Sequence, residues 1–342
     1  MFSLYSFSLP FTEPFRTPVT TITRRDGLIL RYGDHYAEAS PLPGFSPDTI
    51  EQVIRRYTDN SETLTHFFDS EFDYDALTNL VKDFTGLPSL QFALSMLGFK
   101  ILNNRNKPAD TIAGLFDKDS SGVAVNEVAG TDVTIDQVRS QVKEGATVIK
   151  FKVGSEPGNT ADLLHSLHRQ FPDLQFRLDA NRSWPAGRVN EFSSLFKALP
   201  VQYIEEPAIF SGTNELQNLL KICELPVALD DSIQSLQVFK EYSALNDEKI
   251  TAYIIKPTFF GDIPGLFETI SRQHSLVDKV VCTSAFESTA GLADIRRMAA
   301  AYGSKTLAHG LGTGRFFSSN FCRTLPETFG DLNPELLELI GN

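Results

Sequence analysis

The sequence has little cysteine, and its arrangement excludes two common kinds of small, cross-linked architecture. Cys223, Cys282 and Cys322 are an odd and widely spaced set among the 342 residues. Such a set fits neither a disulfide framework nor a thiolate zinc site. We interpret the three residues as buried thiols in a reducing compartment, so the sequence predicts a cytoplasmic protein.

The chain also lacks long apolar runs and an excess of basic residues. No run approaches the roughly 20 apolar residues of a membrane helix, and residues 2–9 alternate like a strand rather than a signal peptide. With 31 Lys and Arg against 43 Asp and Glu, the formal net charge is −12. Such a surface repels phosphate backbones. We therefore expect no membrane and no nucleic-acid partner, while the oligomeric state stays open.

What is present is enough apolar sequence for a large core, since 42% of the residues are hydrophobic. The length favours one large domain and a smaller one. The first 115 residues have an α+β pattern, with strands at 2–9 and 27–32, a helix that starts at Ser46-Pro47, and an apolar helix at 90–102. We expect residues 315–342 to return to this domain.

From about residue 122 short apolar runs alternate with helical stretches, the pattern of βαβ units. The runs are Val123–Val125, Thr147–Val153, Gln175–Leu178, Gln202–Ile204, Val227–Leu229, Ala252–Ile255, Lys279–Cys282 and Thr306–Ala308. Eight such runs predict an α/β barrel over residues 116–314. A doubly wound open sheet is the alternative, but no glycine-rich phosphate turn follows the first run.

Charged residues recur where these runs end. Lys152, Asp179, Glu205, Asp230 and Lys256 follow one another at intervals of about 26 residues, one β/α unit each. The carboxyl ends of barrel strands form the face on which active sites are built. We therefore expect these side chains to converge at the mouth of the barrel.

The residue types indicate metal chemistry. Carboxylates from three adjacent strands would repel one another in a partly desolvated site, and a divalent cation removes that cost. Oxygen ligands favour a hard ion, Mg²⁺ first and Mn²⁺ second. Lys150 and Lys152 share one face of their strand, and Lys256 lies four strands further round the barrel, on the opposite wall.

This arrangement resembles the enolase superfamily, in its muconate-lactonizing subgroup, over nearly the whole chain. Lys-x-Lys, Asp-x-Asn, Glu-Glu-Pro, Asp-x-Ser and Lys-Pro elements match in order and spacing. The resemblance implies a (β/α)7β barrel under an N-terminal α+β capping domain. Within the subgroup the chain is most similar to the dehydratases of menaquinone biosynthesis, on the stretches 38–46, 177–184 and 255–258. Racemases of N-acylated amino acids share parts of these stretches.

The resemblance implies a role for each residue of the row. Asp179, Glu205 and Asp230 would ligate the metal, Lys152 would be the general acid/base, and Lys256 would face it across a small carboxylate substrate. Lys152 must be neutral to accept a proton, and the positive charge of Lys150 beside it favours that form. The ammonium so formed can protonate a departing hydroxyl on the same face, a syn elimination.

Two departures from the family pattern concern the supports of the site rather than its ligands. Asp231 stands where the family usually has Glu, and Asn126-Glu127 stands where it tends to have Asn-Gly. A site like that of mandelate racemase would need a Lys-x-His element, which is absent. An inactive barrel would have lost a ligand or a lysine, and none is missing here.

Further residues are candidates for contacts with the substrate. The last run is followed by His309-Gly310-Leu311-Gly312-Thr313, without the acidic pair with which dipeptide epimerases bind an α-amino group. The candidates are Asn181, Ser284, Glu287, His309, Gly310 and Thr313. For His309 a structural histidine is the alternative, and for the glycines it is a simple turn. The segment 17–26, with Arg24 and Arg25, corresponds to a mobile capping loop in the family, and a plain basic hairpin is the alternative.

Overall fold

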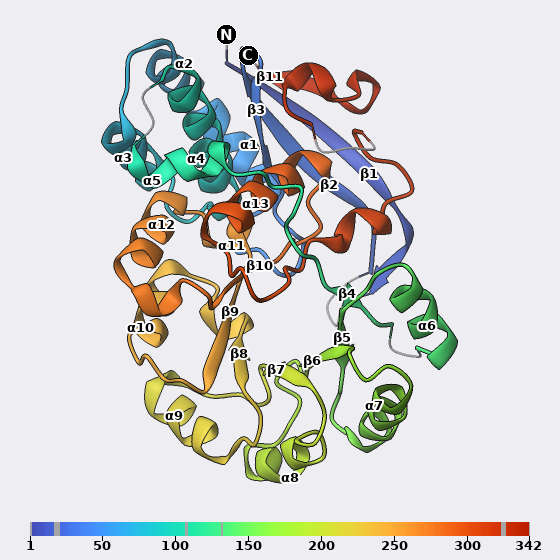
Figure 1. The fold of residues 1–342 in the computed structure, drawn as a ribbon. Coiled ribbons are helices and arrows are strands. Elements are labelled where there is room, and N and C mark those ends of the chain that lie inside the picture. The colour runs from blue at the N-terminus through green and yellow to red at the C-terminus, as the bar shows by residue number, and fades with distance from the viewer. Residues whose placement is uncertain (1, 17–20, 107–108, 131–132, 323–325, 342) are drawn as a thin grey trace.

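The computed structural model describes residues 2–16, 21–106, 109–130, 133–322 and 326–341. Two sheets organise these residues. An antiparallel sheet of order β11-β1-β2-β3 lies above a parallel sheet of order β10-β9-β8-β7-β6-β5-β4, and the parallel strands form an arc with helices outside it (Figure 1). No helix among the described residues is long and apolar enough to cross a membrane.

The antiparallel sheet belongs to the capping region. It contains β1 (Phe2–Arg16), β2 (Thr21–Tyr32), β3 (His35–Ala39) and β11 (Glu338–Gly341). Four helices cover it: α1 (Ile50–Thr58), α2 (Ser61–Asp69), α3 (Tyr74–Asp83) and α4 (Pro88–Asn104). The predicted strands and the apolar helix are present. The predicted helix start at Ser46 was wrong, because Thr49 and Gln52 form a capping box and α1 begins at Ile50.

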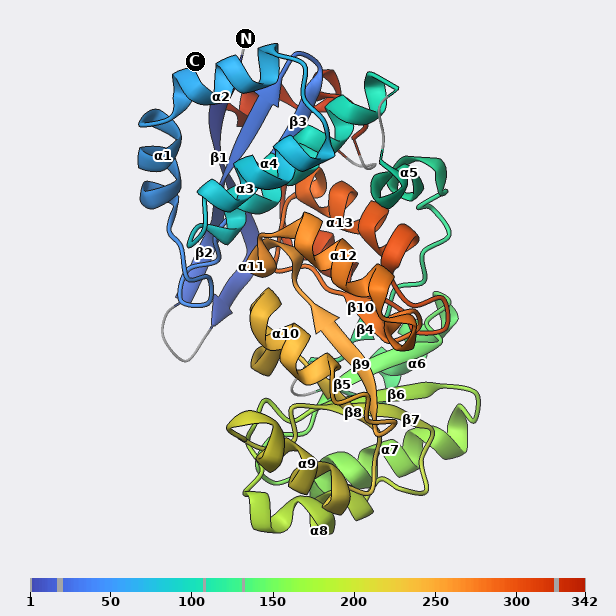
Figure 2. The ribbon, with the colours of Figure 1, turned by 90° about the vertical axis from the view of Figure 1, so that its left-hand side faces the viewer.

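Helix α4 is the core of the contact between the two sheets. Its residues from Pro88 to Leu102 are all buried, and it packs against β3 on one side and α11 (Pro257–Phe260) and α12 (Ile263–Arg272) on the other. A helix that is apolar all round requires such burial on every face. Figure 2 shows α4 between the capping sheet and the barrel.

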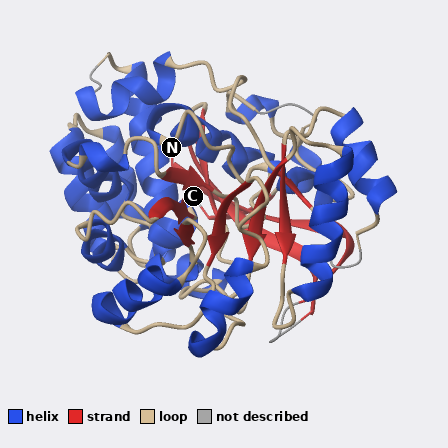
Figure 3. Cartoon of the chain, turned by 60° about the horizontal axis from the view of Figure 1, so that its bottom comes forward, coloured by secondary structure: helices blue, strands red, loops and turns tan. Residues whose placement is uncertain are grey.

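The barrel strands are short and parallel. They are β4 (Glu127–Val128), β5 (Val148–Lys152), β6 (Gln175–Asp179), β7 (Val201–Glu205), β8 (Val227–Leu229), β9 (Ile250–Ile255) and β10 (Val280–Cys282). The helices around them include α5 (Asp110–Asp117), α6 (Ile135–Lys143), α7 (Gly158–Gln170), α8 (Val189–Ser194), α9 (Gly212–Ile222), α10 (Leu236–Ser243) and α13 (Thr289–Tyr302). Figure 3 shows the strands at the centre, surrounded by these helices.

The seam between β10 and β4 differs from the prediction. The first barrel strand was expected at Val123–Val125, but the paired strand is Glu127–Val128. The expected eighth strand at 306–308 is reduced to isolated parallel bridges of His309 with Val125 and of Gly310 with Thr283. These bridges close the barrel, as a (β/α)7β architecture requires. Sequence alone placed this seam a few residues too early because its strands are too short to show a period.

The C-terminal residues pack against the start of the chain. β11 pairs with β1, and Phe317 forms a bridge with Phe11. Both observations agree with a C-terminal segment that returns to the capping sheet, while the boundaries 115 and 315 stay predictions. Of the three thiols, Cys223 and Cys282 are buried and Cys322 is half-buried, and all are free.

Candidate active site

A pocket of about 330 Å³ lies between the mouth of the barrel and the capping sheet, a size typical of small-molecule sites. Most of its polar lining comes from strand ends: Lys150, Lys152, Asp179, Asn181, Glu205, Asp230, Asp231 and Lys256. Strands β5 to β9 supply these residues in sequence order. The structure therefore brings together the whole predicted row of carboxylates and lysines.

Parallel register places the carboxylates side by side. Lys152 pairs with Asp179 across β5 and β6, and Asp179 pairs with Glu205 across β6 and β7. The side chain of Glu205 is 3% exposed and that of Asp179 is 7% exposed. Carboxylates that water reaches so little require positive charge close by.

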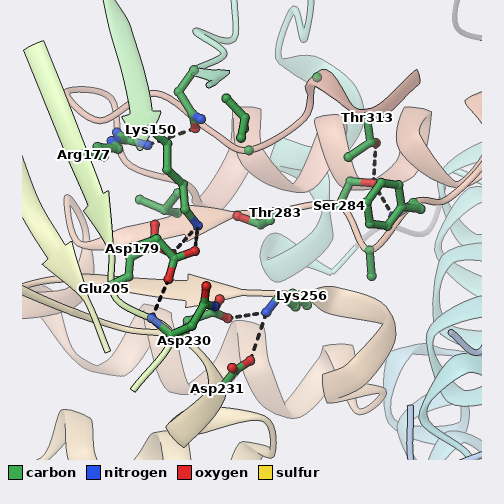
Figure 4. Close-up of a pocket in the computed structure, with 18 of the residues that line it drawn as sticks. Lys150, Arg177, Asp179, Glu205, Asp230, Asp231, Lys256, Thr283, Ser284 and Thr313 are labelled. Atoms are coloured by element: carbon green, nitrogen blue, oxygen red, sulfur yellow. Dashed lines mark hydrogen bonds and ion pairs between the residues drawn. The ribbon is translucent and has the colours of Figure 1, made fainter. Parts of the chain in front are cut away.

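Lysines supply that charge. Lys150 Nζ lies 2.9 Å from Asp179 Oδ2 and also donates to Glu205. Lys256 Nζ donates to Asp230 Oδ1 at 2.5 Å and to Asp231 Oδ1 at 3.4 Å. Figure 4 shows these two ammonium groups on opposite sides of the carboxylate cluster.

The ionisation of these groups reflects burial and mutual charge. Burial and the repulsion of Asp179 and Asp230 raise the pKa of Glu205 to about 7, although Lys150 opposes the rise. Burial likewise raises the pKa of Asp230 against the opposing effect of Lys256. For Lys150, burial is outweighed by the three carboxylates, which raise its pKa well above the usual value. The cluster therefore binds positive charge strongly and still has a carboxylate whose negative charge is incompletely compensated.

Lys152 differs from the other two lysines of the pocket. Its side chain is 50% exposed and its Nζ is 4.0 Å from Asp179 Oδ2. Asn181 Oδ1 accepts a hydrogen bond from Lys152 Nζ at 2.7 Å. Lys152 therefore extends into the open part of the pocket, where a substrate can reach it.

The turns after the strands are held in unusual backbone conformations. Asn181, Arg182 and Glu206 have φ of 46°, 60° and 43°, values that residues other than glycine rarely adopt. Glu206 accepts hydrogen bonds from the backbone N–H groups of Asp230 at 2.8 Å and of Ser232 at 3.0 Å. The second Glu of the Glu-Glu-Pro element therefore fixes the next strand end, and strained turns of this kind gather at functional sites.

The donor set fits a hard divalent cation. Asp179, Glu205 and Asp230 offer carboxylate oxygens from three adjacent strands, and such ligands suit Mg²⁺. In the described residues no three His, Cys, Asp or Glu side chains form a ready-made metal site. The ammonium groups of Lys150 and Lys256 stand among the carboxylates and supply the positive charge instead.

The remaining predicted substrate contacts divide into two groups. Ser284, Gly310 and Thr313 line the pocket, and Thr313 Oγ1 donates to Ser284 Oγ at 2.7 Å. A Cβ on Gly310 would lie 2.7 Å from Thr283 Oγ1, so glycine is required there by close packing. Asn181 also lines the pocket, as described above. These four predicted residues are therefore placed where a ligand would lie.

Glu287 and His309 lie behind the lining. Glu287 is fully buried and accepts hydrogen bonds from Ser284 Oγ at 2.6 Å and Thr258 Oγ1 at 2.7 Å. His309 Nδ1 accepts from the N–H of Cys282 at 3.0 Å, and Nε2 lies 3.1 Å from the carbonyl oxygen of Ser304. Both ring nitrogens of His309 are engaged at the barrel seam and His309 is not among the residues that line the pocket, which favours the structural alternative, while its contact with a substrate stays a prediction.

Arg177 and Tyr203 line the floor of the pocket and were missed at the sequence level. Arg177 is 1% exposed and Tyr203 is fully buried. Arg177 Nη1 donates to the carbonyl oxygen of Ala308 at 2.7 Å, while Arg177 Nη2 and the Tyr203 hydroxyl have no hydrogen-bond partner within the described residues. Side chains two residues apart on a strand point to the same face, and Arg177 stands two residues before Asp179 on β6. This spacing is the sequence signal that could have revealed Arg177.

The apolar walls were also missed. Phe15, Leu42, Phe45, Phe286 and Phe316 line the pocket and come from four separate segments of the chain. The rings of Phe15 and Phe286 lie 4.6 Å apart, and those of Phe286 and Phe316 lie 5.6 Å apart. Of the predicted loop at 17–26, residues 17–20 lie outside the described residues. Residues 21–26 belong to the first half of β2.

Comparison with known proteins agrees with this site and fold. Residues 133–270 match the family model described as Enolase C-terminal domain-like. The parallel strands closed under an antiparallel capping sheet agree with this match, so the chain is similar to the enolase superfamily in sequence and in fold.

Curated relatives define a narrower group, the o-succinylbenzoate synthases. That of Haemophilus influenzae is 29% identical over 311 residues, which cover 88% of this chain and 86% of the relative. That of Aliivibrio fischeri is 26% identical and covers 87% and 85%. The fold is also that of the o-succinylbenzoate synthase of Thermosynechococcus elongatus, solved with Mg in its active site, at a TM-score of 0.73 and 21% identity over 95% of this chain and 96% of that chain.

Proposed function

We propose that the protein is a Mg²⁺-dependent o-succinylbenzoate synthase, a hydro-lyase of menaquinone biosynthesis. It would dehydrate 2-succinyl-6-hydroxy-2,4-cyclohexadiene-1-carboxylate to o-succinylbenzoate. One observation carries the proposal. A row of three carboxylates on β6, β7 and β8 lies between Lys152 on β5 and Lys256 on β9, within one pocket. The names of the curated relatives support the choice of substrate.

The reaction begins with removal of a weakly acidic proton next to a carboxylate, which leaves a second negative charge on the substrate. Asp179, Glu205 and Asp230 would hold the Mg²⁺, and a bound Mg²⁺ supplies positive charge that stabilises this developing charge. Lys256 adds an ammonium group held by Asp230 and Asp231. Lys150 balances the carboxylates from the β5 side.

Lys152 is the proposed general base because its amino group is the exposed one and faces the open pocket. After it accepts the proton, its ammonium can donate that proton to the departing hydroxyl on the same face. A single residue thus serves as base and then acid in a syn elimination. A second base is not needed because the proton and the hydroxyl leave from the same face, and the aromatic product makes the reaction strongly downhill.

The apolar walls suit the ring of such a substrate. Phe15, Phe286 and Phe316 line the pocket, and their rings lie next to one another. Burial of a carbon ring against them contributes binding free energy through removal of apolar surface from water.

A second function is favoured by one observation, the presence of Lys152 and Lys256 on opposite walls. A racemase of N-succinylated amino acids needs two such bases, one for each face of the α-carbon. The decisive assay gives purified Mg²⁺-loaded protein both substrates. Loss of the diene absorbance with formation of succinylbenzoate supports the proposed dehydration. Racemisation of N-succinyl amino acids without dehydration would replace it with the second function.

A further inference from the structure

A single buried arginine connects both sides of the pocket wall. Arg25, on β2 of the capping sheet, is fully buried. Its Nε donates to the carbonyl oxygen of Phe286 at 3.0 Å, and its Nη1 donates to that of Pro41 at 2.7 Å. Its Nη2 donates to the carbonyl oxygen of Ser40. Phe286 belongs to the loop between β10 and α13, whereas residues 40 and 41 belong to the loop after β3.

Both anchored segments carry residues that line the pocket. Leu42 and Phe45 follow Ser40-Pro41 directly, and Ser284, Ala285 and Phe286 form the wall on the barrel side. The position of each segment relative to the other therefore depends on the three bonds of Arg25. Neither loop has regular secondary structure to fix it.

Buried carboxylates balance the charge of Arg25 and hold the same loop. Burial lowers the pKa of Arg25, and the negative charges of Glu287 and Glu38 oppose this effect. Glu38, on β3, accepts hydrogen bonds from Ser288 N at 3.1 Å and from Gly291 N at 2.9 Å. Glu38, a residue of the capping sheet, thus binds backbone N–H groups at the N-terminus of helix α13. A Cβ on Gly291 would come within 3.0 Å of Glu38, which shows how closely the two regions approach.

Phe286 itself is strained. Its φ is 64°, a value that is unfavourable for a bulky residue and persists only where the surroundings impose it. The carbonyl oxygen of this residue is the one that Arg25 binds. Its ring contacts Phe15 on β1, at 4.6 Å between centroids. The capping sheet therefore holds both the backbone and the ring of Phe286.

We infer that Arg25 is a positioning residue for substrate binding, which sets the aromatic wall of the pocket by anchoring Phe286 to the loop at Ser40-Pro41. It does not touch the pocket, and it acts through Phe286. This inference deepens the proposed function and rests on it for its kinetic test. One measurement below is independent of any substrate.

The matched control is Lys100, another buried cation of the capping region that holds the barrel. Lys100 Nζ on α4 lies 2.8 Å from Asp294 Oδ1 on α13 and donates to the carbonyl oxygen of Tyr36 at 2.7 Å. Neither Lys100 nor Asp294 lines the pocket. Arg25→Met and Lys100→Met each remove a buried cation at the same interface, so both should lower the stability of the fold. Only Arg25→Met should displace the aromatic wall of the pocket.

The kinetic test compares the two variants in the dehydration assay. We expect Arg25→Met to raise KM by about tenfold or more with a smaller change in kcat, and Lys100→Met to leave KM within about twofold. Arg25→Lys keeps the positive charge but loses the planar set of N–H donors of the guanidinium group. Its KM should therefore lie between those of the wild type and Arg25→Met. Equal KM values for Arg25→Met and the wild type would overturn the inference.

A double-mutant cycle shows whether Arg25 acts through Phe286. Phe286→Ala keeps the backbone strain and removes the ring. In this background Arg25→Met should change KM by less than about twofold, because the ring through which Arg25 is proposed to act is gone. Effects that multiply instead would mean that Arg25 acts by another route, and the inference would fail.

Amide hydrogen exchange of the segment 283–288 needs no substrate and separates this inference from the proposed function. We expect faster exchange of that segment in Arg25→Met or Arg25→Lys and unchanged exchange in Lys100→Met. Unchanged exchange in both Arg25 variants would refute the inference even if dehydration is confirmed. A wild-type protein without dehydratase activity would reject the proposed function and leave this test intact.

Discussion

The pocket has two halves that differ in chemistry and in origin. The charged half consists of side chains at the ends of consecutive strands, from Lys150 on β5 to Lys256 on β9. The apolar half includes Phe15, Leu42, Phe45, Phe286 and Phe316, which come from β1, the loop after β3, the loop between β10 and α13, and the segment after the last barrel bridge. The first half is regular because one β/α unit repeats. The second is assembled by the contact between the two sheets, so substitutions in the halves should have different effects.

The largest effect is expected from the lysines of the charged half. Lys152→Ala should lower kcat by about 10² to 10⁴, the usual contribution of a general base. Lys256→Ala should also lower kcat severely through loss of electrostatic stabilisation. The rate of diene loss measures both. Exchange of the substrate's α-proton with solvent that persists in Lys152→Ala would contradict the role of Lys152. Lys197→Ala, an exposed lysine outside the pocket, is the control.

Removal of the metal should be nearly as severe. Excess EDTA should abolish activity and Mg²⁺ should restore it. The reason is that a Mg²⁺ ion held by the carboxylates would stabilise the negative charge that develops on the substrate. Asp179→Asn should weaken Mg²⁺ binding measured by calorimetry while the circular dichroism stays native. Asp173→Asn, an exposed acid that precedes β6, should change neither. Full activity in EDTA would exclude the metal site.

A substitution in the apolar half should act mainly on binding. Phe316→Ala should raise KM by about fivefold, as expected for loss of about 1 kcal/mol of apolar burial from a partly exposed ring, with kcat little changed. Ile209→Ala, at an exposed apolar residue outside the pocket, should leave both constants unchanged. A large fall of kcat in Phe316→Ala would contradict the prediction that the apolar half acts mainly on substrate binding.

Substitution of His309 at the barrel seam should have the smallest effect on activity. Its effect should be on how stability depends on pH. Burial lowers the pKa of His309 to about 4, so between pH 6.5 and 4 the unfolded chain binds a proton that the native protein does not. The contribution of His309 to stability should therefore be constant above pH 6.5 and fall as the pH falls, by up to about 3 kcal/mol, and the difference between wild type and a His309 variant isolates it from other titrating groups. Urea unfolding at several pH values measures this loss. His309→Gln should reduce the slope, and an unchanged slope would contradict the assignment.

The sequence by itself determined the charged half. Lys152, Asp179, Glu205, Asp230 and Lys256 recur once per β/α unit, and parallel strands in register bring residues of equal position to one edge. Periodicity is a local property, so it can be read without knowledge of distant contacts. The residue types then indicated metal-assisted proton transfer, and the relatives bear out the family.

Only the tertiary structure decided the rest. It showed that His309 holds the seam, that Arg177 and Tyr203 form the floor, and that Arg25 joins two loops of the wall. These roles depend on contacts between residues far apart in the chain, such as Arg25 with Phe286. No period or motif records such contacts, because they arise from how the capping sheet packs on the barrel.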